Sequence, residues 1–84
     1  MTIKILFFAA LRDTLGAAEE SLVLPPEIND IGQLRAYLAR RGAQWSALDA
    51  GRNIRAARNQ RMADETEPVQ AGDEIAFFPP VTGG

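Results

Sequence analysis

The sequence closes on the stretch Gly72-Asp73-Glu74-Ile75-Ala76-Phe77-Phe78-Pro79-Pro80-Val81-Thr82-Gly83-Gly84. Its apolar centre, from Ile75 to Phe78, has the length and composition of a β-strand. Two prolines follow at once, and because proline has no N–H to donate to a sheet, the strand is expected to end at Phe78. The prolines stiffen the segment that leaves the strand, whereas the two glycines at its tip carry no side chain. This pattern predicts a folded body over residues 1–78 and a flexible tail over residues 79–84.

The predicted tail is suited to enter a narrow channel in another protein. Extended, it spans roughly 20 Å at most, which is enough to place the terminal carboxylate of Gly84 well inside a partner. The alternative is a frayed terminus, which is common in proteins. Insertion would involve the residues that precede Gly84, namely Pro79, Pro80, Val81, Thr82 and Gly83.

The composition leaves few groups for catalysis. The chain contains no cysteine and no histidine, so it lacks a thiolate nucleophile, a cysteine metal ligand and a side chain with an unperturbed pKa near neutrality. Its acidic residues show no calcium-loop spacing. We therefore expect no bound metal or cofactor, and a non-catalytic role in which partners supply the acids and bases.

The sequence also argues against a membrane or a nucleic acid as partner. No apolar run approaches the ~20 residues of a membrane span, and the N-terminus lacks a secretory signal, so we expect a cytoplasmic protein. The formal net charge is −2. Arginines cluster in mid-chain, from Arg35 to Arg61, and the acidic total favours a solvated face over a nucleic-acid site. The role of the basic stretch Arg52 to Arg61 stays open.

Hydrophobic alternation predicts strands and a short helix in the first third of the chain. Residues 3–10 are expected to form a strand, in which Phe7 faces one side and Phe8 the other. Residues 11–15 are predicted to form a short helix closed by Gly16. A second strand is expected over residues 20–24, where Pro25 ends it.

The clearest helix signal follows the second strand. Asp30 can cap the N-terminus, with Gln33 placed to reach back, and Gly42 is expected just past the C-terminus. An apolar stripe recurs at helical spacing, formed by Ile31, Leu34 and Leu38. Trp45 to Leu48 is predicted to be a short turn or helical piece, in which Trp45 serves packing rather than chemistry.

Three short strands are expected in the last third. Residues 54–57 and 61–63 would pair through a hairpin turn at Asn59-Gln60, and residues 74–78 would form the final strand. Alternation places Phe77 on one face of that strand and Phe78 on the other. The order of elements predicts an α+β fold, with one main helix packed across a sheet.

Two segments carry a likeness to a known family: the closing stretch and, near the start, Ile5-Leu6-Phe7-Phe8-Ala9-Ala10-Leu11-Arg12. Together they closely resemble the small subunit of molybdopterin synthase. The layout matches over the whole chain, and the closing stretch is far more specific than the middle. This resemblance implies a β-grasp, ubiquitin-like fold and a role as sulfur carrier in molybdenum cofactor biosynthesis.

In the mechanism that the resemblance implies, Gly84 is the reactive group. A ubiquitin-activating-type adenylyltransferase uses ATP to turn its carboxylate, a poor electrophile, into an acyl adenylate. A sulfur donor protein then displaces AMP and leaves a thiocarboxylate (1-thioglycine). The loaded tail enters the synthase large subunit, where sulfur moves to precursor Z, a cyclic pyranopterin monophosphate, and builds the molybdopterin dithiolene. The family also implies a carrier–synthase heterotetramer.

The resemblance further implies that Phe8, Arg12 and Phe78 contact the partner. Alternation puts Phe8 and Phe78 on the outer face, and two aromatic residues with an arginine have the composition of an interface hot spot. From alternation alone, the two phenylalanines could equally be core residues beneath a loop. Arg12 could likewise be an ordinary helix residue.

Two other functions remain compatible with the Gly83-Gly84 end. Sulfur carriers of the thiamin pathway share the fold and the final glycines, but they lack the Phe-Phe-Pro-Pro-Val-Thr run. A ubiquitin-like protein modifier would use Gly84 to form isopeptide bonds with lysines of other proteins, and the predicted tail suits that use equally well.

Overall fold

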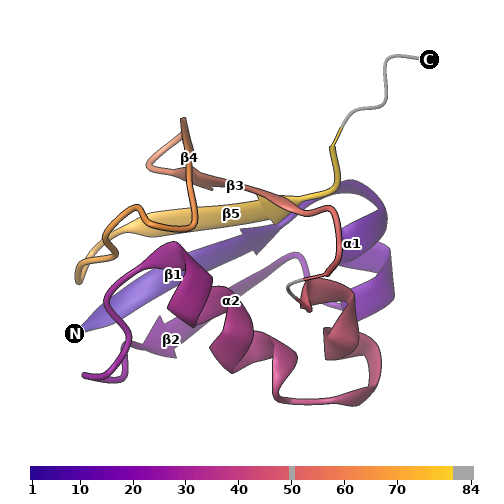
Figure 1. Ribbon diagram of the computed structural model, residues 1–84, viewed down its shortest axis with the longest axis horizontal. Helices are drawn as coiled ribbons and strands as arrows, with labels where there is room; N and C mark the ends of the chain where they lie inside the picture. Colours follow the sequence, from indigo (N-terminus) through magenta and orange to yellow (C-terminus); the bar gives the residue numbers. More distant parts are fainter. Residues whose placement is uncertain (50, 81–84) are drawn as a thin grey trace.

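The closing apolar run forms strand β5, Glu74–Phe78, at the centre of a five-stranded sheet (Figure 1). Strand β5 pairs in parallel with β1, Thr2–Phe7, and antiparallel with β3, Arg55–Arg58. The two edges are β2, Glu19–Val23, and β4, Arg61–Ala63, so the strand order is β2-β1-β5-β3-β4. The computed structural model describes residues 1–49 and 51–80. The tail residues Val81, Thr82, Gly83 and Gly84 lie outside the described residues.

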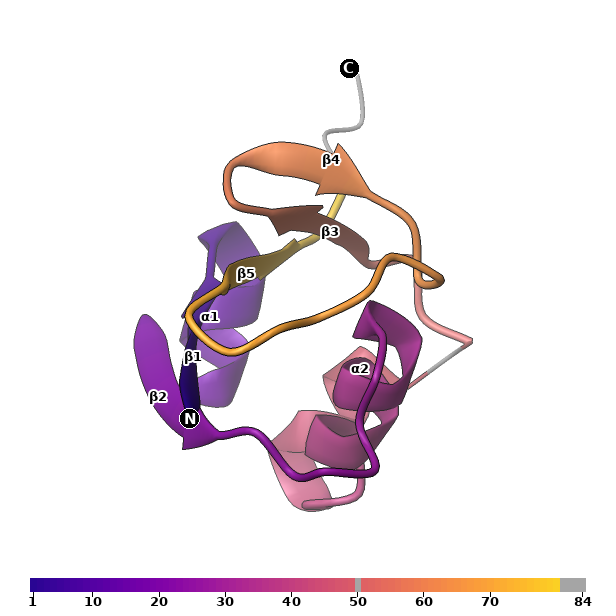
Figure 2. The same ribbon diagram turned by 90° about the vertical axis from the view of Figure 1, so that its left-hand side faces the viewer.

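Helical segments pack on one face of this sheet. Helix α2, Ile31–Ala39, crosses that face, and the 3-10 helix η1, Ala43–Leu48, continues the same layer (Figure 2). Helix α1, Ala9–Leu15, follows β1 directly and packs beside η1 and β5. The arrangement confirms the predicted α+β fold with one main helix across the sheet.

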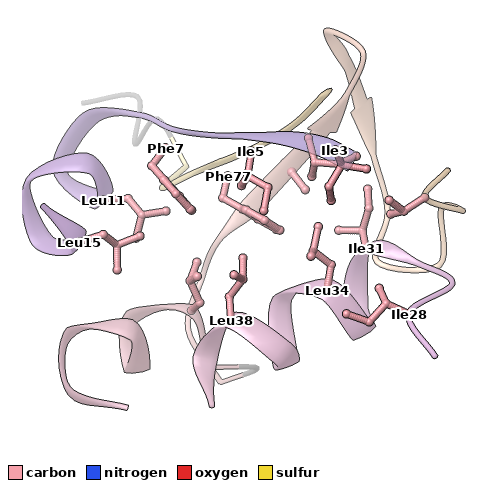
Figure 3. Packing of buried hydrophobic residues seen from close by; sticks show 14 residues of the cluster. Ile3, Ile5, Phe7, Leu11, Leu15, Ile28, Ile31, Leu34, Leu38 and Phe77 are labelled. Atoms are coloured by element: carbon pink, nitrogen blue, oxygen red, sulfur yellow. The ribbon is translucent and has the colours of Figure 1, made fainter. Parts of the chain in front are cut away.

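The core lies between the sheet and this helical layer (Figure 3). From the sheet, Ile5 and Phe77 point inward, and from α2 the stripe Ile31, Leu34 and Leu38 meets them with no exposed surface. Trp45 packs edge-on against Phe7, with 5.6 Å between ring centroids, which confirms its predicted packing role. These contacts turn one face of the sheet into the buried interior.

Helix α2 begins as its sequence predicts. The Asp30 side chain accepts a hydrogen bond from the Gln33 backbone N–H at 2.8 Å, which is the N-cap geometry. The Gln33 side chain reaches back to the backbone N–H of Asn29 rather than that of Asp30. The helix ends at Ala39, so the prediction that Gly42 directly follows its C-cap was wrong. Gly42 instead is the N-cap residue of η1, with a positive φ of 77°.

Several strand boundaries differ from the predicted ones. Strand β1 ends at Phe7 rather than at residue 10, because Ala9 adopts a positive φ of 56° and turns the chain into α1. Gly16 closes α1 in the left-handed conformation, as predicted. Strand β2 begins and ends one residue earlier than predicted, and β3 begins and ends one residue later.

The β3–β4 hairpin turns at Asn59-Gln60, as predicted. Both residues have positive φ, 50° and 70°, which is the backbone of the two-residue turns that match the twist of paired strands. Asparagine tolerates this conformation better than most residues do, whereas glutamine has no such preference.

Candidate protein-docking site

An apolar row crosses the sheet face opposite α2. The ladder pairs Leu6 with Ala76, Ala76 with Ala57, and Ala57 with Met62, so these four residues lie side by side on β1, β5, β3 and β4. Directly paired residues of a sheet share a face, and alternation puts this face away from the core. The two central members are alanines, which have short side chains, whereas Leu6 and Met62 at the two ends have long ones. The surface of the row is therefore recessed in its middle.

This row forms the floor and walls of a groove of about 410 Å³, called the outer groove here. Phe8 is 46% exposed and Met62 is 67% exposed, and both line it. Its lining consists of Leu6, Phe8, Ala57, Gln60, Met62, Glu74, Ala76 and Phe78. Large apolar side chains that stay open to solvent around a hollow mark a surface for binding another molecule.

The structure brings Phe8 and Phe78 together, as the predicted docking patch requires. Phe8 is the N-cap residue of α1. Its backbone N–H donates to the Phe77 carbonyl at 3.2 Å, which links the end of β1 to the end of β5. The exposure of Phe8 excludes the alternative that it is a core residue, and Phe78 is half-buried beside it.

Arg12, the third predicted contact residue, lies outside the lining of the outer groove. It is exposed on α1, and its N–H lies 3.4 Å from the Phe8 carbonyl, one helical turn back. Arg12 therefore lies near the patch without forming part of it, and its contact with a partner stays a prediction.

The outer groove ends where the tail begins. Arg55 and Phe78 form the last pair between β3 and β5, and Pro79 follows directly. Since proline cannot donate to the ladder, the pairing stops there. Pro79 and Pro80 are half-buried and outside any strand. A partner seated in the outer groove would therefore lie next to the origin of the tail.

Sequence reasoning missed part of the lining. Leu6 alternates with Phe8 and could have been found by that signal, whereas Met62, Ala57 and Ala76 become neighbours only through the pairing of β5 with β3 and of β3 with β4. Met62 had no signal of its own, because three residues are too few to show an alternation.

Two arginines of the mid-chain cluster are not on a solvated face, so that prediction was wrong for them. Arg35 is 5% exposed and donates to the carbonyls of Leu48, Asp49 and Arg52 at 2.6–2.7 Å. Arg58 donates to Asp73 at 2.8 Å and to Glu67 at 3.1 Å. Both side chains hold loops in place, so part of the basic stretch has a structural role.

Asp73 is the centre of a polar cluster at the start of β5. Its carboxylate accepts hydrogen bonds from Arg58, from the Asn59 amide at 3.1 Å and from the Gln70 N–H at 2.7 Å. Burial opposes its ionisation, but these hydrogen bonds and the charge of Arg58 outweigh burial and lower the pKa of Asp73. The carboxylate is therefore ionised at neutral pH.

A second hollow, also of about 410 Å³, lies on the helix side between α2 and the β3–β4 hairpin. Within its lining, Arg35 pairs with Glu65 at 3.7 Å, so the charge of Arg35 is already neutralised by a neighbouring side chain. Within residues 1–49 and 51–80 no group of acidic side chains is placed to hold a metal ion. Over the same ranges, no helix has the length and apolar character needed to cross a bilayer.

A mixed five-stranded sheet with a helix across one face defines this chain as a ubiquitin-like β-grasp protein. Residues 5–84 match the model of the ThiS family, and the chain belongs to that family.

Individual relatives make the likeness more specific. The chain is 39% identical over 83 residues to the molybdopterin synthase sulfur carrier subunit of Escherichia coli (strain K12), covering 98% of this chain and 99% of the relative. Among solved structures, SAMP1 from Haloferax volcanii is 28% identical with a TM-score of 0.75 and full coverage of both chains. The complex of subunits 1 and 2 of molybdopterin-converting factor from Helicobacter pylori 26695 contains a chain that is 26% identical, with a TM-score of 0.69 and full coverage of both. These findings confirm the family resemblance drawn from the two ends of the sequence.

Proposed function

We propose that this chain is the sulfur carrier subunit of a molybdopterin synthase, with its folded body presenting Gly84 to other proteins. The observation that carries the proposal is the 39% identity to such a subunit over 98% of the chain. The absence of cysteine supports it, because without a thiol the C-terminal carboxyl group is the natural place to hold transferable sulfur.

The proposed chemistry begins with a carboxylate that must be activated. The α-carboxyl group has a pKa near 3.5, so it is an anion at neutral pH and a poor electrophile. An adenylyltransferase joins it to AMP from ATP, releasing pyrophosphate. The sulfur of a donor protein's persulfide attacks the carbonyl carbon and AMP leaves, and reduction of the remaining sulfur–sulfur bond by a thiol frees the thiocarboxylate. The carrier then gives this sulfur to precursor Z in the synthase.

The outer groove supplies the docking surface in this proposal. Its occupant is the large subunit of the synthase, with Phe8 and Phe78 as apolar anchors and Arg12 at the margin. The complex of subunits 1 and 2 of the H. pylori factor supports a partner of this kind, because one of its chains shares this fold. A partner docked here would lie beside Pro79 and Pro80, from which the rest of the tail continues.

The sulfur-loading step is tested by intact-mass analysis. After incubation with the adenylyltransferase, ATP and a sulfur donor, the mass should show one oxygen exchanged for sulfur, and fragmentation should place it on Gly84. A variant lacking Gly84 should fold and take up no sulfur. Sulfur at another position, or synthase activity in the truncated variant, would refute the role given to Gly84. Product formed only with the thiazole-forming system would assign the chain to the thiamin pathway instead.

The docking surface is tested by binding to the purified large subunit. Phe8→Ala should weaken binding roughly 10- to 100-fold, as expected for an anchor at the centre of an interface. Val23→Ala is the matched control, because Val23 is 69% exposed on β2 and lies outside the lining of the outer groove. Equal affinities for both variants would show that the outer groove is not the docking site.

A second candidate function is that of a protein modifier. It is favoured by the structural likeness to small archaeal modifier protein 1 of H. volcanii, which is 27% identical with a TM-score of 0.74. In that role Gly84 would form isopeptide bonds with lysines of other proteins. Denaturing gels of cell extracts would then show a ladder of heavier conjugates, whereas a carrier would run as one free species.

A further inference from the structure

One side of the outer groove, called the far wall here, is formed by Gln60 and Met62 of the β3–β4 hairpin. We infer that Arg58, Asn59 and Asp73 position this far wall, although they lie on the opposite side of the sheet. These three residues are called the hairpin clasp here. The inference rests on the proposed function, because the groove they shape is the proposed docking site for the large subunit.

The far wall of the outer groove is a part of the fold that needs support. Met62 lies on β4, an edge strand held to β3 by three residue pairs, and Gln60 lies in the turn. A two-stranded hairpin of this length is marginally stable by itself. Its turn adds a further cost, because Gln60 adopts a positive φ of 70° without being a glycine. Contacts beyond the ladder must therefore fix where this wall stands.

The hairpin clasp supplies those contacts. The Asp73 carboxylate accepts from Arg58 Nε at 2.8 Å through one oxygen and from Asn59 Nδ2 at 3.1 Å through the other. Asn59 is in turn joined to the first residue of β5, because its N–H donates to the Glu74 carbonyl at 2.8 Å and its Oδ1 accepts from the Glu74 N–H at 3.0 Å. The turn of the hairpin is thus fastened to the start of the central strand.

The clasp residues do not line the outer groove. Arg58 pairs in the ladder with Ile75, whose side chain is fully buried in the core, so Arg58 projects from the helix side of the sheet. Asp73 is 8% exposed. Their influence on Met62 is therefore carried by the backbone of the hairpin, which makes them positioning residues and not contact residues.

The chain contains a matched ion pair that lacks this connection. Arg41 donates to Glu20 through two nitrogens, one of them at 2.8 Å, and joins the segment just after α2 to the edge strand β2. Glu20 pairs with the fully buried Ile5 and so lies on the helix side as well. Neither Glu20 nor Arg41 lines the outer groove. Breaking the ion pair between Glu20 and Arg41 should lower the free energy of unfolding without moving the far wall of the outer groove.

The experiment compares Asp73→Asn and Asn59→Gly with the control Glu20→Gln. Asparagine keeps the shape of Asp73, and glycine suits the positive φ of position 59. Affinity for the purified large subunit is measured beside thermal stability. Both clasp variants should bind about 3- to 10-fold more weakly, whereas the control should bind as the wild type does even where its melting temperature falls.

A second readout needs no partner. The chain has two methionines, so a protein labelled at the methionine methyl groups gives two signals, and Met62→Leu identifies the one from the wall. The Met62 signal should shift or broaden in both clasp variants and stay in place in Glu20→Gln.

The outcomes separate this inference from the proposed function. If the wild type does not bind the large subunit, the proposed function fails and this inference fails with it. If the wild type binds and the clasp variants bind equally well, or lose no more affinity than Glu20→Gln does, the inference alone is overturned. An unchanged Met62 signal in both clasp variants would overturn it too.

Discussion

Arg35 shows how one residue can hold a loop that lacks regular structure. It reaches from α2 to three carbonyls at and beyond the end of η1, and its guanidinium is nearly inaccessible to solvent. A buried carbonyl without a partner costs more free energy than a typical hydrogen bond contributes. The buried guanidinium of Arg35 and the loop carbonyls that it contacts therefore stabilise each other. From the sequence, Arg35 was predicted only as one of the arginines clustered in mid-chain. Its contacts could not be predicted, because helical spacing does not show which polar side chain contacts a loop.

Replacing this arginine tests the dependence. Arg35→Met keeps much of the side-chain volume but removes all three hydrogen bonds to the loop, although the Asp49 and Arg52 carbonyls each keep a backbone N–H donor. We expect a loss of about 2–4 kcal/mol in the free energy of unfolding. Urea denaturation followed by Trp45 fluorescence measures it. Arg40→Met, at the exposed C-cap of the same helix, should change stability by less than about 0.5 kcal/mol. Similar losses in the two variants would mean that the carbonyl contacts of Arg35 are not what stabilises the loop.

At the scale of elements, the β3–β4 hairpin combines a favourable and an unfavourable turn residue. Asn59 suits its positive φ and also bonds to Glu74 and Asp73 through its side chain. Gln60 has the same backbone region without that preference. A two-residue turn of this kind is most stable with glycine at the second position, so the hairpin has not reached the stability that its geometry allows.

Gln60→Gly should therefore stabilise the fold. Removing the side chain at a φ of 70° relieves the left-handed strain, and we expect a gain of about 0.5–1 kcal/mol after the extra chain entropy of glycine. A rise of a few degrees in the melting temperature would report it. Because Gln60 also lines the outer groove, partner affinity should be measured in the same variant. A fall in stability would show that the Gln60 side chain makes a contact worth more than the strain.

The sequence predicted most of this element and little of the groove beside it. The turn at Asn59-Gln60 was evident from local signals, and so was β4. That Met62 stands in line with Ala57, Ala76 and Leu6 depends on strand order, which local patterns do not contain. The same limit explains the misplaced end of β1, where continued alternation through residue 10 concealed the turn at Ala9.

At the scale of the whole molecule, two polar clusters on the helix side fasten the ends of the sheet. One joins Asp73 to Arg58 and the other joins Glu20 to Arg41. The hydrogen bonds from Arg41 lower the pKa of Glu20, and the pKa of Asp73 is lowered despite its burial. In both places the folded state favours the ionised carboxylate.

The pH dependence of stability follows from these two shifts. A carboxylate whose pKa is lowered by folding adds stability above its unfolded pKa, ordinarily 3.8 for Asp and 4.5 for Glu, and this contribution is lost as the pH falls through the folded value. Stability should therefore fall below about pH 4.5. Asp73→Asn should be less stable than the wild type at pH 7, and the gap should narrow by pH 3. A gap that is constant with pH would contradict the lowered pKa of Asp73.

The sequence by itself determined the elements with local causes: the capped helix α2, the hairpin turn, the final strand and its two prolines, and the cysteine-free chain that ends on two glycines. Only the tertiary structure decided which side chains gather on the open face of the sheet and which charges hold it together. The reason is that capping, turn preference and alternation act between residues a few positions apart. The outer groove and the hairpin clasp instead join β1, β5 and the β3–β4 hairpin, which lie far apart in the sequence and become neighbours only when the sheet forms.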